Sequence, residues 1–454
     1  MNTPIANFVR NYKAENKLRL HMPGHKGRGE LGIEALDITE IDGADVLYGT
    51  ADKSGIIGES QANAAKIFGT AKTLYSTEGS SLAIRAMLYL AKLYGKNNYI
   101  LAGRNAHKTV MSASALLNLN VEWYREQTGP TDTGAYDLVS CNITPNGLEY
   151  ALSNRAYKPC AVYVTSPDYL GNVLDIAGLA EVCHAHDTIL IVDNAHGAYL
   201  KFLQPSMHPI DLGADLCCDS AHKTLPVLTG GAYLHISKNA PEMFVGQAER
   251  AMALFASTSP SYLILQSLDL ANRYLSEGYE ERLQKFVDSV AILKTRLTEA
   301  GFILCGNEPL KLTIAPKSYG YTGTDFAKLL SRSGIECEFS DPDYVVMMLT
   351  PEIGLDALND IFRAMTSIEK QTPLLSAPPR LPIPRRACTI REAVFSPSRT
   401  CPLHEARGKT LAAASVSCPP AIPILMCGEV IDEAAIRCFE YYGITEVRIR
   451  SNTF

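Results

Sequence analysis

The chain has 454 residues, of which 46% are hydrophobic and 20% charged, so it is long enough for two or more domains and has the composition of an ordinary globular protein. Its formal net charge of -6 gives no electrostatic reason to expect a nucleic-acid partner. The amino terminus lacks the apolar core of a signal peptide, and no apolar run reaches the ~18 residues of a membrane span, so we expect a cytoplasmic protein.

Short apolar runs alternate in the first 270 or so residues with longer segments whose apolar residues recur every three or four positions. This alternation is typical of strands joined by helical crossovers, and it predicts an α/β fold with a mostly parallel sheet. The predicted strands cover residues 98–102, 161–165, 188–192, 214–218 and 231–236, and the predicted crossover helices include residues 80–94 and 174–186.

A different pattern begins after about residue 270. A long charged helix is predicted over residues 278–300, and shorter α/β elements then end near Glu369. The segment that starts at Gln371 is rich in proline, which favours an extended connector. We therefore predict an amino-terminal segment 1–50, a large domain 51–275, a smaller α/β domain 276–370, a linker 371–387 and a carboxy-terminal α+β domain 388–454.

The twelve cysteines are scattered and form no Cys-x-x-Cys pair. Several lie in apolar surroundings. We therefore expect buried, reduced thiols and neither a metal site nor a disulfide scaffold.

Polar residues follow four of the predicted strands. Because ligands of an open parallel sheet bind beyond the carboxyl ends of its strands, these residues are the candidates for a functional site. We expect them to converge on one edge of the sheet. They are Asn105–Lys108, Ser166–Tyr169, Asp193–His196 and Asp219–Lys223.

Lys223 is the first candidate for chemistry. An isolated lysine is usually a solvated surface charge, but Lys223 follows an apolar strand and is flanked by the small polar residues Ser220, His222 and Thr224. An amine held between desolvating walls and other cations has a lowered pKa and can form a Schiff base. Pyridoxal 5'-phosphate (PLP) requires such a lysine, so we interpret Lys223 as its attachment point.

An acid is also required, because the protonated pyridine ring of PLP accepts electron density from a substrate carbanion. Asp193 fits this role, since it follows a predicted strand and is separated from Lys223 by one crossover and the next strand. Taken alone, Asp193 is equally well interpreted as a helix-capping residue.

Three further groups complete this hypothesis. Ser80 and Ser81 open a predicted helix, whose amino terminus favours phosphate, although serine is also a common plain cap. His107 follows a strand and is placed to stack on the cofactor ring, or is simply structural. His196 faces either the substrate or the cofactor, or caps a helix.

Five segments of the sequence resemble, in order and spacing, the bacterial-type Orn/Lys/Arg decarboxylases. The resemblance runs from about residue 5 to 445 and includes Thr389–Phe395 and Pro419–Glu429 near the carboxy terminus. It implies the aspartate-aminotransferase-like fold of PLP enzymes, known as fold type I. The five segments are His21–Gly27, Arg104–Lys108, Val192–Ala198, Ser220–Thr229 and Ser257–Leu263.

The resemblance also implies a role for each candidate residue. Lys223 would carry the cofactor, Asp193 would pair with the pyridine nitrogen, His107 would stack on the ring and His196 would lie near the substrate. The phosphate would be held by Ser80, Ser81, Ser220 and His222.

The implied reaction is decarboxylation of arginine, lysine or ornithine, which supplies polyamine synthesis, and arginine is slightly favoured. Glu392 and Asp45 are candidates for holding the far end of the substrate, with exposed loop acids as the alternative interpretation. Family members form dimers or higher homo-oligomers, so residues 258–261 are expected to serve the cofactor of a neighbouring subunit. An aminotransferase or lyase of the same fold is the alternative function, and a binding or regulatory protein without activity is a third.

The sequence departs from the family pattern at three places. Asn194 stands where the family usually has Glu, and Gly230-Gly-Ala stands where it often has Gln-Ala-Ser. No receiver-like wing domain precedes His21, so the chain resembles the short members of the family. The first two departures affect the shape of the pocket and the choice of substrate.

Overall fold

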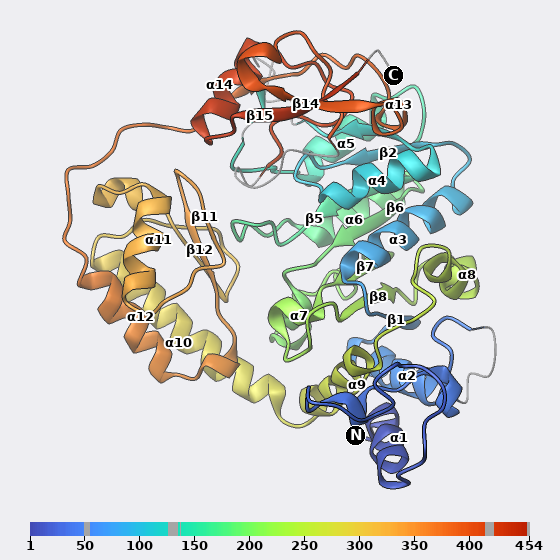
Figure 1. The fold of residues 1–454 in the computed structure, drawn as a ribbon. Coiled ribbons are helices and arrows are strands. Elements are labelled where there is room, and N and C mark those ends of the chain that lie inside the picture. Colours follow the sequence, from blue (N-terminus) through green and yellow to red (C-terminus); the bar gives the residue numbers. More distant parts are fainter. Residues whose placement is uncertain (50–54, 126–134, 137, 414–421, 452–454) are drawn as a thin grey trace. The chain divides into compact units, whose positions relative to one another are not determined.

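The computed structural model describes residues 1–49, 55–125, 135–136, 138–413 and 422–451 (Figure 1). The chain divides into two compact units. The first contains Met1–Tyr94 and Ile189–Leu283, and the second contains Gly95–Thr188 and Gln284–Phe454. The predicted start of the large domain at residue 51 and the first residues of the Pro419–Glu429 segment lie outside the described residues.

The first unit contains four hydrogen-bonded strands in the order β1-β8-β7-β6. The predictions for β6, β7 and β8 are confirmed to within two residues. β6 and β7 are parallel, whereas β8 is antiparallel to both β7 and β1. β8 follows β7 through the short helix α7 (Ala221–Thr224) and a turn, and it is an antiparallel member of the mostly parallel sheet that was predicted. The strands are β1 (Lys72–Ser76), β6 (Ile189–Asp193), β7 (Leu216–Asp219) and β8 (Ala232–Ile236).

Helices of the first unit cover these strands and one another. The 15-residue helix α3 (Ser80–Tyr94) has the predicted bounds, and its apolar side chains, such as Leu82 and Met87, are buried where it packs on β7 and β8. Helix α8 packs on α3, and α2 packs on β1 and α9. The remaining helices are α1 (Pro4–Ala14), α2 (Ile56–Phe68), α7 (Ala221–Thr224), α8 (Glu242–Ala253) and α9 (Tyr262–Ser276), with 3-10 turns η1 (Glu34–Leu36), η2 (Glu40–Asp42) and η3 (Ala198–Phe202).

The second unit contains a parallel set of strands and a separate antiparallel sheet. In the parallel set, β2 lies between β3 and β5, and both predicted strands, over 98–102 and 161–165, are confirmed. The antiparallel sheet has the order β11-β12-β10-β9. The long charged helix predicted over 278–300 is α10 (Tyr279–Glu299). The other elements are β2 (Tyr99–Ala102), α4 (Lys108–Leu117), β3 (Asn120–Trp123), α5 (Pro145–Ser153), β5 (Ala161–Thr165), α6 (Ile176–Ala185), β9 (Leu304–Cys305), β10 (Lys311–Ile314), η4 (Pro316–Tyr319), α11 (Gly323–Arg332), β11 (Phe339–Ser340), β12 (Val345–Met348), η5 (Pro351–Ile353) and α12 (Asp356–Thr366).

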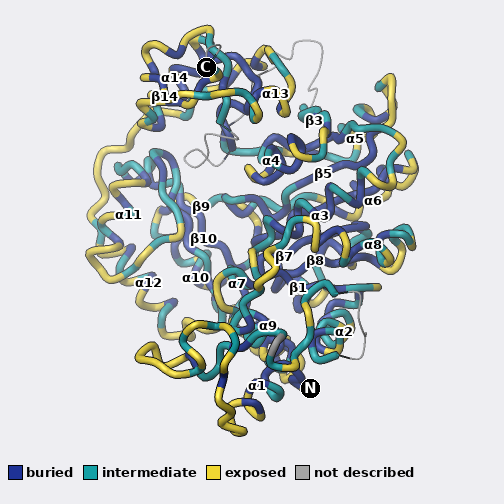
Figure 2. Tube along the Cα trace, turned by 45° about the vertical axis from the view of Figure 1, so that its right-hand side comes forward, coloured by how far each residue is buried: buried dark blue, intermediate teal, exposed yellow. Residues whose placement is uncertain are grey.

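The carboxy-terminal segment of the second unit forms its own apolar core. Residues 371–380 contain neither helix nor strand, whereas the rest of the predicted linker 371–387 includes the short strand β13 (Leu381–Pro382). Beyond them, Leu381, Leu411, Ile424 and Phe439 are fully buried in one cluster, and Figure 2 shows how buried and exposed positions alternate there. The elements are β4 (Ala135–Tyr136) paired with β13 (Leu381–Pro382), α13 (Ile390–Val394), β14 (Ser398–Pro402) paired with β15 (Glu446–Arg450), η6 (Leu403–Glu405) and α14 (Glu433–Tyr441).

A buried ion pair joins the end of β2 to this core. The Arg104 guanidinium donates to both carboxylate oxygens of Glu429, at 2.9 and 2.8 Å, and to the Ile424 carbonyl oxygen at 3.0 Å. The Met426 amide donates to Glu429 as well. Both charged side chains are almost fully buried, so removal of either partner would leave an uncompensated charge without water.

The cysteines that the structure describes are all free thiols, and seven of these eleven are buried. The expectation that they form no metal site stays a prediction. Across the same residues, no helix is long and apolar enough to cross a membrane.

Two buried aspartates follow β11 and have different surroundings. Asp343 forms an ion pair with Lys317 at 2.5 Å and accepts a hydrogen bond from the Tyr441 hydroxyl at 2.7 Å. Asp341 accepts hydrogen bonds from the backbone amides of Asp343 and Tyr344, both at 2.7 Å to the same oxygen. Burial, with a smaller contribution from the neighbouring Asp343, raises the pKa of Asp341 to about 6.

We predict that Asp341→Asn stabilises the protein at pH 7.5 and not at pH 4. A carboxyl group whose pKa is raised by folding lowers stability above the folded pKa, and this cost disappears as the pH falls through about 6 toward the unfolded value. Asparagine keeps the acceptor oxygen and removes the charge, so the gain is up to about 3 kcal/mol. Melting temperatures at the two pH values measure it.

Asp343→Asn is the matched control, because it removes the partner of Lys317 and should lower the melting temperature at pH 7.5. An Asp341→Asn gain of equal size at both pH values would contradict the assignment of a buried charge.

Candidate active site

Lys223 lies in the short helix α7, directly after β7, and contacts a histidine. Its Nζ atom is 3.1 Å from Nε2 of His196, which is 6% exposed and belongs to the turn after β6. The Lys223 amide donates to the Ser220 carbonyl oxygen, and the Gly197 amide donates to the Asn194 carbonyl oxygen. These two tight turns direct both side chains to the same place. Because the two nitrogens share one hydrogen bond, one of them donates and the other accepts.

Asp193 ends β6 and is 2% exposed. Its Oδ1 atom accepts from the Ala195 amide at 3.2 Å and from the Cys218 thiol at 3.6 Å. Asp193 lies opposite Cys218 in the parallel register of β6 and β7, so residues that follow the two strands lie at one edge. Within the first unit, this confirms that the two clusters Asp193–His196 and Asp219–Lys223 converge.

The start of α3 and the segment after β7 meet through two hydroxyls. Ser220 Oγ donates to Ser80 Oγ at 2.8 Å, and Ser80 is the first residue of α3. The first amides of a 15-residue helix, together with its dipole, favour an anion at this position. His222 Nδ1–H donates to the Gly231 carbonyl oxygen at 2.9 Å, which fixes the orientation of the ring.

Gly79 keeps the space before α3 open. It has φ +69° and donates its amide to the Gly230 carbonyl oxygen at 2.7 Å. A Cβ atom at this position would stand 4.0 Å from the Ser81 amide nitrogen and 4.0 Å from Cε1 of His222. The Cβ would therefore occupy the space that an anion on this helix terminus needs.

Two buried polar atoms next to these residues have no hydrogen-bond partner within the described ranges. They are Oγ1 of Thr224 and Oδ1 of Asn194. A buried polar atom without a partner is uncommon in a finished interior and is frequent where a ligand completes a site. An amine, a buried carboxylate and an anion-binding helix terminus within one unit are the groups that PLP requires, so the residues present fit this cofactor.

The other predicted site residues have local partners. His107 belongs to the second unit, where it caps α4 and its Nδ1 atom lies 2.9 Å from Oγ1 of Thr109. Asp45 accepts from the Ile57 amide at 2.8 Å and so holds the first turn of α2. Glu392 is exposed and forms the capping box of α13 with Thr389. The roles of these three residues toward cofactor or substrate stay predictions.

Sequence reasoning included Asp219 among the site candidates without a role, and it missed the two buried histidines that contact it. Asp219, the residue before Ser220, contacts His208, His235 and Asn194. The available signal was a charged residue at the end of an otherwise apolar strand. Its two histidines lie in segments that carry no recognisable motif, so only the fold reveals them.

We predict that Gly79→Ala weakens PLP binding by about tenfold or more, since the added methyl group competes with the phosphate for space. The affinity is measured by titrating the apoprotein with PLP and following absorbance. Gly334→Ala is the matched control, because Gly334 also has a positive φ of +80° but has no neighbouring atom within 4 Å of the added Cβ. It should cost similar backbone strain and leave PLP affinity unchanged, and equal loss in both variants would contradict the proposed cradle.

Comparison with known proteins gives one consistent result. The family model for Orn/Lys/Arg decarboxylase, major domain, matches residues 3–307. The arginine decarboxylase of Bacillus subtilis is 29% identical to this chain, over 96% of this chain and 92% of that protein. The alignment with the Bacillus subtilis protein extends over nearly the whole length of both proteins.

Solved structures show the same fold. The lysine decarboxylase LdcF of Francisella novicida aligns with a TM-score of 0.77 and 17% sequence identity, over 99% of this chain and 81% of that chain. An SPT structure with PLP aligns with a TM-score of 0.51 and 13% identity, over 68% of this chain and 75% of that chain. The chain therefore belongs to the Orn/Lys/Arg decarboxylase family, whose fold is that of the PLP-dependent, aspartate-aminotransferase-like decarboxylases.

Proposed function

We propose that this protein decarboxylates L-arginine, in preference to L-lysine or L-ornithine, and releases CO2 and agmatine. The family supports decarboxylation of a basic amino acid. The choice of arginine is supported by relatives from Bacillus subtilis and Halalkalibacterium halodurans that are named arginine decarboxylase. The observation that carries the proposal is the contact of Lys223 Nζ with the buried His196 imidazole at 3.1 Å, beside the carboxylate of Asp193.

Asp193 is suited to hold a proton on the pyridine nitrogen. When PLP is bound, its protonated ring supplies the electron sink that decarboxylation needs. A carboxylate excluded from water and oriented by the Ala195 amide keeps a fixed direction. A cation placed against it is stabilised far more than it would be in water.

Lys223 and His196 are suited to move a proton. Their nitrogens share one hydrogen bond, so a proton held at Nζ of Lys223 or Nε2 of His196 can be delivered to the α-carbon after CO2 has left. The burial of His196 excludes water from this transfer. The pocket must also hold the α-carboxylate out of the plane of the ring, because this orientation selects loss of CO2 over loss of a proton.

Asp45 and Glu392 remain the proposed acids for the far end of the substrate. A guanidinium group forms two parallel hydrogen bonds with a carboxylate, whereas an ammonium group binds as a point charge. A planar acid partner at this position would therefore favour arginine.

We also propose that the protein is a cytoplasmic homodimer or higher homo-oligomer and that its product feeds polyamine synthesis. A subunit interface is supported by the segment between residues 18 and 46, which exposes apolar side chains to an unusual extent. Leu18, Leu20, Leu31, Ile33 and Val46 are each 50–83% exposed.

The experiment that tests the function offers arginine, lysine and ornithine separately to the PLP-loaded protein and identifies the CO2 and the amine. We expect CO2 and agmatine from arginine, with slower or no release from the other two. Absence of CO2 from all three would overturn the decarboxylase proposal. Consumption of a 2-oxo acid without CO2 would favour an aminotransferase instead.

Lys223→Ala should remove the visible absorbance of lysine-linked PLP and abolish CO2 release, because the attachment amine is lost. Absorbance spectra after gel filtration, with and without added PLP, measure this directly. Lys238→Ala, at an exposed position in the same unit, is the control and should keep both properties. Persistence of the absorbance band in Lys223→Ala would place the attachment at another lysine.

A further inference from the structure

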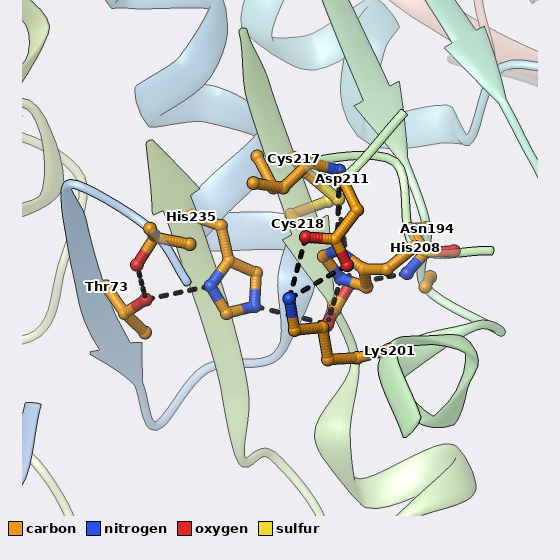
Figure 3. Close-up of polar contacts among 12 residues, drawn as sticks. Thr73, Asn194, Lys201, His208, Asp211, Cys217, Cys218 and His235 are labelled. Atoms are coloured by element: carbon orange, nitrogen blue, oxygen red, sulfur yellow. Dashed lines mark hydrogen bonds and ion pairs between the residues drawn. The ribbon is translucent and has the colours of Figure 1, made fainter. Parts of the chain in front are cut away.

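The carboxylate of Asp219 is the centre of a buried polar network. Its Oδ2 atom accepts from Nε2 of His208 and from Nε2 of His235, each at 3.1 Å, and its Oδ1 atom accepts from Nδ2 of Asn194 at 2.7 Å. All four side chains are 0% exposed. Figure 3 shows Asn194, His208 and His235 in this arrangement. A buried charge of this kind is stabilised by the hydrogen bonds that its neighbours donate to it.

Both histidines face the carboxylate as neutral donors. Burial lowers the pKa of His235, and its Nδ1 atom is 2.9 Å from the Thr73 hydroxyl (Figure 3), which can donate to it. Nδ1 of His208 accepts from the Ile210 amide at 3.4 Å. A neutral imidazole that accepts at Nδ1 carries its hydrogen at Nε2, so both rings donate to Asp219 and the network holds one negative charge.

The orientation of Asn194 agrees with this charge. Its amide NH2 group faces Asp219, while its Oδ1 atom has no hydrogen-bond partner in the described part of the chain. An ionised carboxylate accepts hydrogen bonds only. The histidines, against the opposing effect of burial, hold the pKa of Asp219 below its usual range.

The network lies directly behind the candidate active site. Asp219 precedes Ser220, and Asn194 follows Asp193, so each member of the Asn194–Asp219 pair is the chain neighbour of a site residue. The backbone amide of Asn194 also donates to the Cys218 carbonyl oxygen at 3.0 Å. The side-chain hydrogen bond between Asn194 and Asp219 joins β6 and β7 one position beyond their last paired residues.

Position 194 carries a side-chain amide directly against the Asp219 carboxylate. A second carboxylate at this position would face Asp219 at hydrogen-bond distance, with no water to separate the charges. Two carboxylates that close cannot both ionise. The uncharged amide of Asn194 therefore allows Asp219 to carry the negative charge.

We propose that Asp219 is a positioning residue of the cofactor-binding edge, which through Asn194 fixes the end of β6 that presents Asp193. This inference rests on the proposed role of Asp193 as partner of the pyridine nitrogen. The proposal predicts that the carboxylate and the amide can exchange places between positions 194 and 219. Two carboxylates or two amides at these positions should weaken PLP binding.

The test compares Asn194→Asp, Asp219→Asn and the double variant, all nearly isosteric. PLP affinity is measured by absorbance titration, and the melting temperature is measured on the apoprotein. We expect each single variant to bind PLP about tenfold more weakly or worse, because it doubles the buried charge or removes it. In the double variant, the amide introduced at position 219 can donate to the carboxylate introduced at position 194, while the amide oxygen accepts from both histidines. The affinity of the double variant should return to within about threefold of the native value.

Asp269→Asn is the matched control. Asp269 is also 0% exposed and belongs to the first unit, where it accepts from Ser60 Oγ at 2.6 Å and from the Ala6 amide at 3.0 Å. Its substitution should lower the melting temperature and leave PLP affinity unchanged. This outcome separates a general loss of stability from an effect on the cofactor-binding edge.

Several results would overturn the proposal. These are single variants with lowered melting temperature but native PLP affinity, or a double variant that binds PLP no better than Asp219→Asn. If the single variants do not fold, a folded and PLP-binding double variant supports the proposal, and a double variant that also fails refutes it. Failure of the proposed function is recognised separately, by a Lys223→Ala protein that keeps its absorbance band.

Discussion

The parallel pairing of β6 with β7 is the constraint on which the candidate active site depends. With Asp193 opposite Cys218, the two strands end at the same level, and the residues that follow them turn in the same direction. Asp193 and His196 come from one strand end and Ser220 and Lys223 from the other. A shift of one residue in this register would turn the end of one strand to the opposite face of the sheet, and the Lys223–His196 contact would be lost.

This pairing places the buried Asp193 carboxylate and the buried Ser220 hydroxyl near the partly buried Lys223 amine. Buried polar groups are costly unless they are hydrogen-bonded. The structure satisfies them with short local bonds. Ala195 and Cys218 donate to Asp193, and Ser220 donates to Ser80. Two of the buried groups with an unsatisfied atom among the described residues, Thr224 and Asn194, lie next to the residues proposed to hold PLP. Stability and cofactor binding therefore depend on the same set of polar contacts.

Two sets of buried charged side chains in this protein are stabilised in different ways. Arg104 and Glu429 neutralise each other through two parallel hydrogen bonds. Asp219 has no cation against it among the described residues, and neutral donors surround it instead. The first arrangement joins separate segments of the chain. The second keeps a net negative charge close to the cofactor-binding edge, where a protonated pyridine ring would be favoured.

The sequence by itself predicted the features that depend on neighbouring residues. Apolar runs located β2, β5, β6, β7 and β8 to within two residues, and the spacing of apolar residues located α3. The polar residues that end these strands pointed to Lys223 and Asp193, since strand ends place side chains at a ligand edge whatever the rest of the fold does. The ordered motifs then indicated the family.

Only the tertiary structure decided which distant side chains meet. The apolar pattern of β8 did not reveal that this strand is antiparallel to β7. The His208–Asp219–His235 contacts and the Arg104–Glu429 pair join segments with no shared sequence pattern. A lone histidine or arginine in a sequence has the same appearance whether it is solvated or buried against a carboxylate. The burial of a side chain and its hydrogen-bond partners are properties of the folded chain. The network around Asp219 is therefore evident only from the arrangement of β6, β7 and β8 in the sheet.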